Sequence, residues 1–198
     1  MKKMLSHKKS LNILKRTNAL LEGHFVLSSG LHSSKYIQCA KLLSFPHIAS
    51  KICKSLSLKI KKNFKSFDMI LSPAIGGIVI GYEIGRLLKK ETIFCERVNG
   101  RFKLRRGFSI KKNSKVIIIE DVITTGKSSL ECVDLIKKAN ARFIGFATII
   151  DRSVKKNLKI KSKIISHMKI EVPTYKKKDL PDSLQSIPIL SPGSRYLR

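Results

Sequence analysis

The chain has few acidic residues, few aromatic residues and no tryptophan. Only 13 of its 198 residues are Asp or Glu, against 41 Lys and Arg, so the formal net charge is +28. An excess of this size points to an anionic partner, which would be a nucleic acid, a membrane surface or an anionic substrate. The lysines are scattered from Lys2 to Lys178 without interleaved aromatic residues, and this pattern disfavours nucleic-acid binding.

Long apolar runs, targeting signals and metal-binding cysteine motifs are also missing. No segment approaches the roughly 18 apolar residues that cross a bilayer, and residues 1–18 lack the apolar stretch of a signal peptide. The four cysteines, at positions 39, 53, 95 and 132, form no C-x-x-C motif and no Cys/His cluster with zinc spacing. We therefore expect a soluble, cytoplasmic protein with reduced thiols and no membrane partner.

Apolar segments with strand and helix periodicity alternate along the chain, and hydrophobic residues make up 42% of it. This alternation predicts an α/β fold with a parallel sheet. Glycines and basic residues at 97–110 indicate a projecting loop or hairpin, and the pattern after Asp151 indicates short strands, one helix and an ordered tail. The expected helices are 10–22, 47–58, 77–88 and 128–139; the expected strands are 68–71, 92–95, 116–119 and 143–150, with a hairpin at 25–27 and 36–38.

The stretch from Ile117 to Ser129 carries the strongest functional signal. An apolar strand delivers two adjacent carboxylates, Glu120 and Asp121, to a loop of small and hydroxyl-bearing residues that opens a helix. Ligands of open α/β sheets bind at the carboxyl ends of the strands, and the backbone N–H groups of 124–129 can bind a phosphate. The carboxylates repel a phosphate and suit hydroxyl groups, so the stretch predicts a sugar-phosphate site.

Two other interpretations fit parts of this stretch less well. Thr124 or Thr125 could simply cap the helix, with Asp121 as a turn residue, but this does not explain two carboxylates at the end of an apolar strand. The run Gly126-Lys127-Ser128 suggests an ATPase loop, but the first glycine of that motif is missing and an acidic pair precedes the run.

The run from Glu120 to Ser129 resembles the phosphoribosyl pyrophosphate (PRPP) signature of the type I phosphoribosyltransferases. Further segments resemble the orotate phosphoribosyltransferases of that family, in the same order and over nearly the whole chain. The resemblance implies a central, mostly parallel sheet flanked by helices, in one domain over 1–198. A small hood would be formed by about 1–45 and the C-terminal part. The resembling segments are 23–36, 72–83, 96–97 with 104–108, 151–153 and 192–195.

The resemblance also implies roles for individual residues. Glu120 and Asp121 would bind the ribose 2- and 3-hydroxyls, and the loop after them would bind the 5-phosphate. Thr124 would touch orotate, and Arg152 would pair with the orotate carboxylate, which a planar guanidinium can bind bidentately. Asp121 and Lys103 would be the catalytic residues. The implied PRPP contacts are Glu120, Asp121, Val122, Ile123, Thr124, Thr125, Gly126, Lys127, Ser128 and Arg97.

Arg152 and two segments that also resemble the family have simpler interpretations. Arg152 could form a surface ion pair with Asp151, and 73–77, which resembles the family's pyrophosphate loop, could be an ordinary turn. Residues 98–107, which resemble a mobile lid that reaches into a partner subunit's site, could be a solvated basic hairpin. The lid lacks the histidine of many relatives, so Lys103, Arg105 and Arg106 are its candidate cations; His32, Lys35 and Lys127 also depart from the family pattern.

The expected reaction belongs to de novo pyrimidine (UMP) biosynthesis. Orotate's ring nitrogen would displace pyrophosphate from C1 of the ribose, with Mg²⁺ carried in on PRPP, no metal site in the chain itself and a homodimer that shares its active sites. A purine-base transferase and an RNA-binding regulator of the same fold are the alternatives. Arg152 argues against a purine, which has no carboxylate, and a clustered basic face would favour the regulator.

Overall fold

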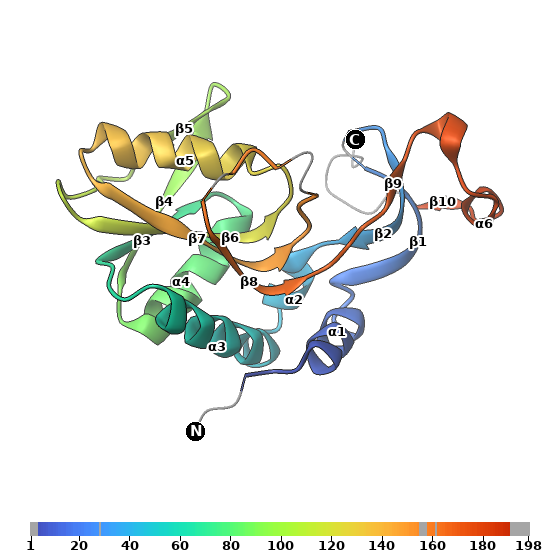
Figure 1. The fold of residues 1–198 in the computed structure, drawn as a ribbon, viewed down its shortest axis with the longest axis horizontal. Coiled ribbons are helices and arrows are strands. Elements are labelled where there is room, and N and C mark those ends of the chain that lie inside the picture. The colour runs from blue at the N-terminus through green and yellow to red at the C-terminus, as the bar shows by residue number, and fades with distance from the viewer. Residues whose placement is uncertain (1–3, 28, 155–157, 161, 191–198) are drawn as a thin grey trace.

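A six-stranded sheet forms the centre of the molecule in the computed structural model, which describes residues 4–27, 29–154, 158–160 and 162–190 (Figure 1). Its strand order is β5-β4-β3-β6-β7-β8, and every neighbouring pair is parallel except β4 and β5. The predicted α/β class with a mostly parallel sheet is therefore confirmed. The strands are β3 (Met69–Pro73), β4 (Glu91–Val98), β5 (Arg101–Leu104), β6 (Lys115–Ile123), β7 (Arg142–Asp151) and β8 (Ile164–Lys169).

Helices cover both faces of this sheet (Figure 1). Helices α3 (Pro46–Asn63) and α4 (Gly76–Leu88) pack on one face, where Ile117 and Ile119 of β6 join their core. Helix α5 (Lys127–Lys138) packs on the other face, where Val116 and Ile118 join a second core. A central parallel strand that is buried on both sides needs apolar residues at successive positions, which explains the run before Glu120.

A smaller, four-stranded sheet lies beside the central one, at the right of Figure 1, and we call it the hood sheet. Its order is β10-β1-β2-β9, so it joins strands from the two ends of the described chain. β1 and β2 form an antiparallel hairpin, and β10 lies parallel to β1. The elements are β1 (Leu20–Val26), β2 (His32–Ile37), β9 (Thr174–Tyr175) and β10 (Ile189–Leu190), with α1 (His7–Arg16), α2 (Cys39–Leu43), the 3-10 helix η2 (Lys177–Asp179) and α6 (Asp182–Gln185) around them.

The expected helix over 10–22 is wrong in its second half. Helix α1 ends at Arg16, and Asn18, with φ 53°, turns the chain so that Leu20 enters β1 opposite Ile37. Gly23 does not stop a helix; it lies in β1, where the pairing with β2 is irregular between Glu22 and Phe25. The leucines fit both a helical and a strand spacing, and packing in the hairpin decides between them.

The other expected elements are present, and several are longer than predicted. β6 continues past Ile119, so Glu120 and Asp121 lie inside the strand. The basic region after β4 is a hairpin with β5, closed by Asn99 and Gly100, which both have positive φ as a tight hairpin turn requires. No helix in the described part of the chain is long and apolar enough to cross a membrane. The expected ordered tail and the segment 192–195 lie outside the described residues.

Candidate active site

Glu120 lies near the carboxyl end of β6, and its side chain is buried, with the residue only 7% exposed. The hydroxyl of Ser129, on α5, donates a 2.7 Å hydrogen bond to Glu120 Oε1. Burial raises the pKa of Glu120 to about 7; the Ser129 hydrogen bond lowers that pKa, and the neighbouring Asp121 raises it. Glu120 therefore gains or loses its proton near neutral pH.

Asp121, the second member of the acidic pair, lies against the start of α4. A Cβ atom on Gly76 would stand 2.7 Å from each carboxylate oxygen of Asp121. Burial raises the pKa of Asp121, while hydrogen bonds from the backbone N–H groups of Val122 and Asp121 itself lower it. Thr148 Oγ1 donates to the Asp121 carbonyl oxygen at 2.9 Å, which ties this part of β6 to β7.

The loop from Thr124 to Gly126, which we call the phosphate loop after the ligand predicted for it, leads from β6 into α5. Gly126 has φ 75°, and a Cβ there would stand 2.5 Å from the Ile160 side chain, so this position requires glycine on two grounds. No side chain caps α5, and the backbone N–H groups of Lys127, Ser128 and Ser129 belong to its first turn, which has no helical acceptors. An uncapped helix N-terminus behind two exposed threonines is suited to binding a phosphate.

A second uncapped helix start lies beside the first. No side chain caps α4, so the N–H groups of Gly76 and Gly77 are free of helical acceptors. Gly77 lies close to β6, because a Cβ there would stand 3.1 Å from the Ile119 carbonyl oxygen. Asp121 therefore contacts one helix N-terminus at Gly76 and lies on β6 shortly before the loop that leads to the other. This layout suits a ligand with phosphates at both ends.

Arg152 follows β7 and lies beside the phosphate loop, since its backbone N–H donates to the Ile123 carbonyl oxygen at 2.8 Å. Its guanidinium Nε is buried and has no hydrogen-bond partner among the described residues. Burial lowers the pKa of Arg152, whereas Tyr36 and Cys39 nearby raise it. Asp151 instead accepts a 2.8 Å hydrogen bond from the Ser153 N–H, and no ion pair joins it to Arg152 in the described structure.

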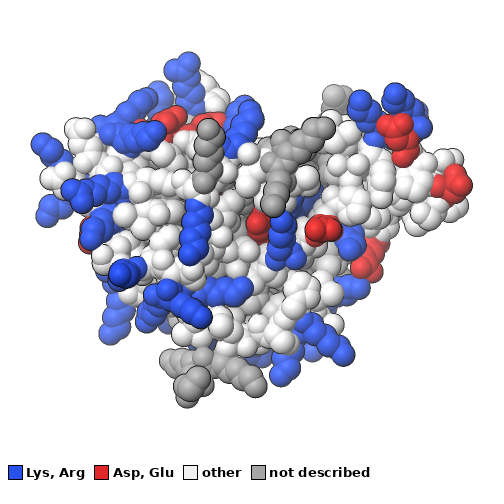
Figure 2. Space-filling view, in the orientation of Figure 1, with Lys and Arg blue, Asp and Glu red and all other residues white. Residues whose placement is uncertain are grey.

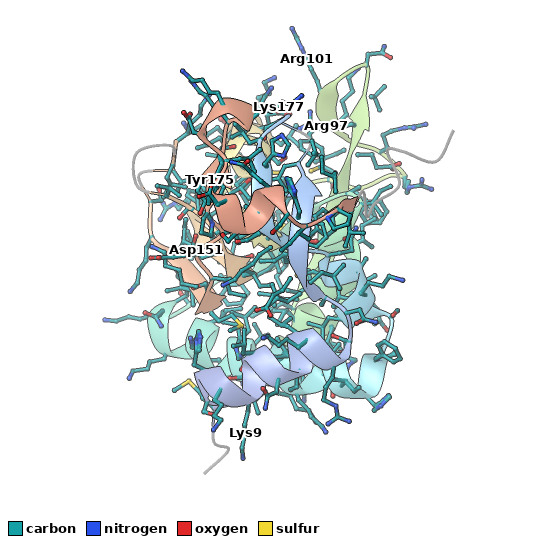
Figure 3. The ribbon with its side chains drawn as sticks, turned by 90° about the vertical axis from the view of Figure 1, so that its right-hand side faces the viewer. Lys9, Arg97, Arg101, Asp151, Tyr175 and Lys177 are labelled. Atoms are coloured by element: carbon teal, nitrogen blue, oxygen red, sulfur yellow. The ribbon has the colours of Figure 1, made fainter. Side chains whose placement is uncertain are left out.

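The hairpin of β4 and β5 carries the two remaining predicted site residues. Arg97 binds Glu131 of α5 with both terminal nitrogens, at 2.9 and 3.2 Å, and its Cζ lies 4.2 Å from the Phe102 ring centroid. Lys103 is exposed on β5 opposite Glu96, and no hydrogen bond or ion pair joins it to the acidic pair among the described residues. Figure 3 shows Arg101 at the outer end of the hairpin and Arg97 nearer the body of the molecule.

The structure thus brings Arg152, the acidic pair and the phosphate loop together and leaves Arg97 and Lys103 on the edge hairpin. Ile123 is buried in the core on the α5 side of the sheet, and Val122 is half-buried against the core on the other side, so both would contact a ligand mainly through the backbone. The sequence predicts Ser129 only as one of the backbone N–H groups that can bind a phosphate, and Tyr36 only as part of the resembling segment 23–36. The hydrogen bond of the Ser129 hydroxyl to Glu120 and the nearness of Tyr36 to Arg152 depend on the folded structure.

On the face shown in Figure 2, the basic residues are spread out rather than gathered around one element. Figure 2 shows Lys and Arg over most of the visible face, with few acidic residues between them. The distribution visible there offers no clustered basic face of the kind that would favour an RNA-binding regulator.

Comparison with known proteins identifies the class. The model of the family described as "Phosphoribosyl transferase domain" matches residues 45–177. The chain therefore belongs to the phosphoribosyltransferase family.

Curated relatives narrow the match within this family to the orotate phosphoribosyltransferases. The protein of that name from Parvibaculum lavamentivorans is 42% identical over 194 residues, which cover 98% of this chain and 100% of the relative. The protein of the same name from Chlorobium phaeobacteroides is 44% identical over 187 residues, which cover 94% of this chain and 95% of that one. The predicted resemblance is confirmed.

Solved structures agree on the fold. The orotate phosphoribosyltransferase from Aeropyrum pernix has a TM-score of 0.64 at 21% identity, covering 80% of this chain and 92% of that one. The adenine phosphoribosyltransferase from Saccharomyces cerevisiae also has a TM-score of 0.64, at 16% identity, covering 80% and 99% of the two chains. Because enzymes for different bases match equally well, fold similarity does not identify the base.

Proposed function

We propose that this chain transfers the 5-phosphoribosyl group from PRPP to orotate, giving orotidine 5'-monophosphate and pyrophosphate in pyrimidine biosynthesis. The buried guanidinium nitrogen Nε of Arg152, which has no partner among the described residues, is the observation that carries the choice of acceptor. A buried charge without a partner is costly, and a carboxylate bound beside the phosphate loop would remove that cost. Orotate has such a carboxylate and a purine base has none. The names of the 42–44% identical relatives favour the same acceptor.

In the proposed reaction, the bond from C1 of the ribose to orotate's ring nitrogen forms as the bond from C1 to pyrophosphate breaks, and the proton of that nitrogen leaves to pyrophosphate or to solvent. No side chain needs to act as a nucleophile, so the residues bind, orient and stabilise charge. Glu120 and Asp121 accept hydrogen bonds from the ribose hydroxyls. Asp121, the proposed catalytic residue of the pair, also places its negative charge near the sugar as positive charge develops there.

We assign the phosphate contacts to the two helix N-termini. The α5 start, with the hydroxyls of Thr124, Thr125 and Ser128 and the amine of Lys127, would hold the 5-phosphate. The α4 start at Gly76 would face the pyrophosphate. Thr124 would reach the orotate as well, because it directly follows Ile123, the residue that accepts the Arg152 hydrogen bond.

The hairpin is proposed as the lid that covers the leaving pyrophosphate. Arg97 would have to exchange its Glu131 ion pair for a pyrophosphate oxygen, and Lys103 would supply the cation that acts on the breaking bond. Both changes need a hinge motion at the base of the hairpin. When the hairpin closes over the site, it excludes water.

Magnesium enters this proposal as part of the donor substrate. The described residues include no group of three or more His, Cys, Asp or Glu side chains that could hold a metal ion. These residues therefore do not fit a resident metal site, and we derive no step through one. Bound to PRPP, Mg²⁺ would offset part of the pyrophosphate charge.

A homodimer with shared active sites is proposed from one face of α4. Ile75, Val79 and Tyr82 recur at helical spacing and are 86%, 53% and 68% exposed. Helix α4 contains no lysine, and its Arg86 is paired with Glu83, so two strongly basic copies could meet there without repulsion. Val79→Asp should yield monomers by sedimentation velocity.

A cytoplasmic setting is proposed because all four cysteines are free thiols.

One assay tests the proposed function directly. The protein is mixed with PRPP and Mg²⁺ and offered orotate, adenine, guanine or hypoxanthine in parallel. We expect orotate absorbance to fall and pyrophosphate to be released only in the orotate reaction. Pyrophosphate release with a purine base, and none with orotate, would overturn the proposed acceptor.

A further inference from the structure

We propose that Ser129 is a positioning residue for PRPP. Its hydroxyl holds the Glu120 carboxylate in place and so joins β6, before the phosphate loop, to α5, after it. Glu120 and Ser129 directly flank the stretch from Asp121 to Ser128, and their hydrogen bond spans it. The inference rests on the proposed function, because it assigns Ser129 a part in the binding of that donor.

The geometry of the pair carries this inference. Ser129 is completely buried at the third position of α5, so its hydroxyl does not contact solvent. At 2.7 Å it donates to only one of the two Glu120 carboxylate oxygens. Glu120 Oε1 is thereby anchored to the helix, and Oε2 is the atom left to accept a hydrogen bond from a ribose hydroxyl.

The hydrogen bond from Ser129 helps to keep Glu120 ionised, because burial and Asp121 raise the pKa of Glu120 and this bond lowers it. The groups that act on Glu120 electrostatically are Asp121 on its own strand and Cys132 one turn further along α5. Cys132 is uncharged, because its contact with Cys95 of β4 and its burial raise its pKa. The residue beside Glu120 on β7 is Thr148, which does not titrate. Of the groups named around Glu120, only the Ser129 hydroxyl favours the ionised carboxylate. The ionised carboxylate is the form that accepts hydrogen bonds from ribose.

Removal of the hydroxyl should therefore act through the protonation of Glu120. In the wild type, kcat/KM for PRPP should rise with pH through a midpoint near 7. Loss of a hydrogen bond to a charged group should move that midpoint up by about one pH unit in Ser129→Ala. At pH 7 this lowers kcat/KM for PRPP about fivefold. The two proteins should converge at high pH, and KM for orotate should stay the same throughout.

Four further variants make the test specific. Ser129→Thr keeps a hydroxyl and should restore the wild-type midpoint. Glu120→Gln should abolish this pH dependence, and adding Ser129→Ala to it should change nothing more. Ser57→Ala removes another buried helix hydroxyl, one that donates only to Lys54 of its own helix, and should leave the profile unchanged. Thermal melting checks that each variant is folded.

PRPP binding by calorimetry at pH 6.5 and 8.5 separates this inference from the proposed function. If orotate is not consumed but Ser129→Ala weakens PRPP binding more at pH 6.5 than at pH 8.5, the acceptor is wrong and the role of Ser129 stands. A loss that is the same at every pH, or an unchanged midpoint in Ser129→Ala, overturns the inference. So does a Glu120→Gln profile that keeps the wild-type pH dependence.

Discussion

The missing side chain of Gly76 is what allows the Asp121 carboxylate to lie against the start of α4. A Cβ atom on Gly76 would stand 2.7 Å from both carboxylate oxygens, closer than real Cβ contacts come. The contact joins the loop proposed for pyrophosphate to the acidic pair proposed for the ribose.

Gly76→Ala should displace the Asp121 carboxylate and weaken PRPP use while keeping the fold. Alanine is a better helix former than glycine, so the substitution does not strain the first residue of α4 in itself. We expect kcat/KM for PRPP to fall on the order of tenfold, with little change in melting temperature. Steady-state kinetics and calorimetry measure the two quantities. Unchanged PRPP kinetics would show that the position of Asp121 is not critical.

Asp121→Asn should keep the fold and lose most of the turnover. The substitution preserves shape and removes the charge that faces the developing positive charge on the sugar. By analogy with loss of one oxyanion-hole donor, the expected cost is about 3–4 kcal/mol in activation free energy. Asp134→Asn, an exposed acid on α5, is the matched control and should be neutral. Near-normal turnover of Asp121→Asn would refute its catalytic role.

Arg152→Ala should raise KM for orotate far more than KM for PRPP. Truncation of a buried, charge-paired contact costs roughly 2–5 kcal/mol, so kcat/KM for orotate should fall at least thirtyfold. Because the guanidinium Nε has no partner in the described structure, the protein without ligand should not lose stability. Arg142→Ala, at an exposed position that begins β7, is the control. Equal rises in both constants would make Arg152 structural.

Mixed dimers test whether the lid acts across the interface. Lys103→Ala and Asp121→Asn are each expected to be inactive. If the lid serves the partner's site, one site of each mixed dimer is intact, and the other carries both substitutions. Random exchange makes about half the dimers mixed, so activity should return to about a quarter of wild type. A tag on one variant verifies exchange, and no recovery after verified exchange would exclude a shared site.

The pair of Ser10 and His167 should make stability depend on pH. Ser10 Oγ and His167 Nε2 lie 2.7 Å apart in the interior, and burial, with Lys59 and His7 nearby, lowers the pKa of His167 to about 4. Because this pKa is below the unfolded value of 6.5, the stabilisation is complete above pH 6.5 and is lost as the pH falls towards 4. The total is roughly 3 kcal/mol.

Comparison with His167→Gln isolates this contribution. The raised pKa of Glu120 acts in the opposite sense, since its effect on stability is lost as the pH rises from about 4.5 to about 7. Both proteins share the Glu120 effect, so the difference between their unfolding free energies reports His167. Urea unfolding at pH 4.5 and 7 should show a larger acid loss in the wild type. Equal losses would contradict the prediction.

The central sheet, and the loop that leads from β6 into α5, could be predicted from sequence because they depend on local patterns. The residues before Glu120 are apolar on both faces, and the hydroxyls and Gly126 follow at once. The change from α1 to β1 could not be predicted in the same way, since Leu20 pairs with Ile37 only in the folded hairpin. Local patterns also do not reveal that Arg97 pairs with Glu131, or that Arg152 Nε is buried without a partner among the described residues, because these features depend on which elements meet.

The position of β10 beside β1 sets an order for folding during synthesis. His24 pairs with Ile189, so β1 leaves the ribosome long before its neighbour exists. The central sheet, whose strands run from Met69 to Lys169, can assemble in the meantime. Until Ile189 and Leu190 arrive, the backbone N–H and C=O groups along one edge of β1 are open to strands of other nascent chains. The hood sheet is therefore the part of the molecule whose assembly a chaperone would most need to protect.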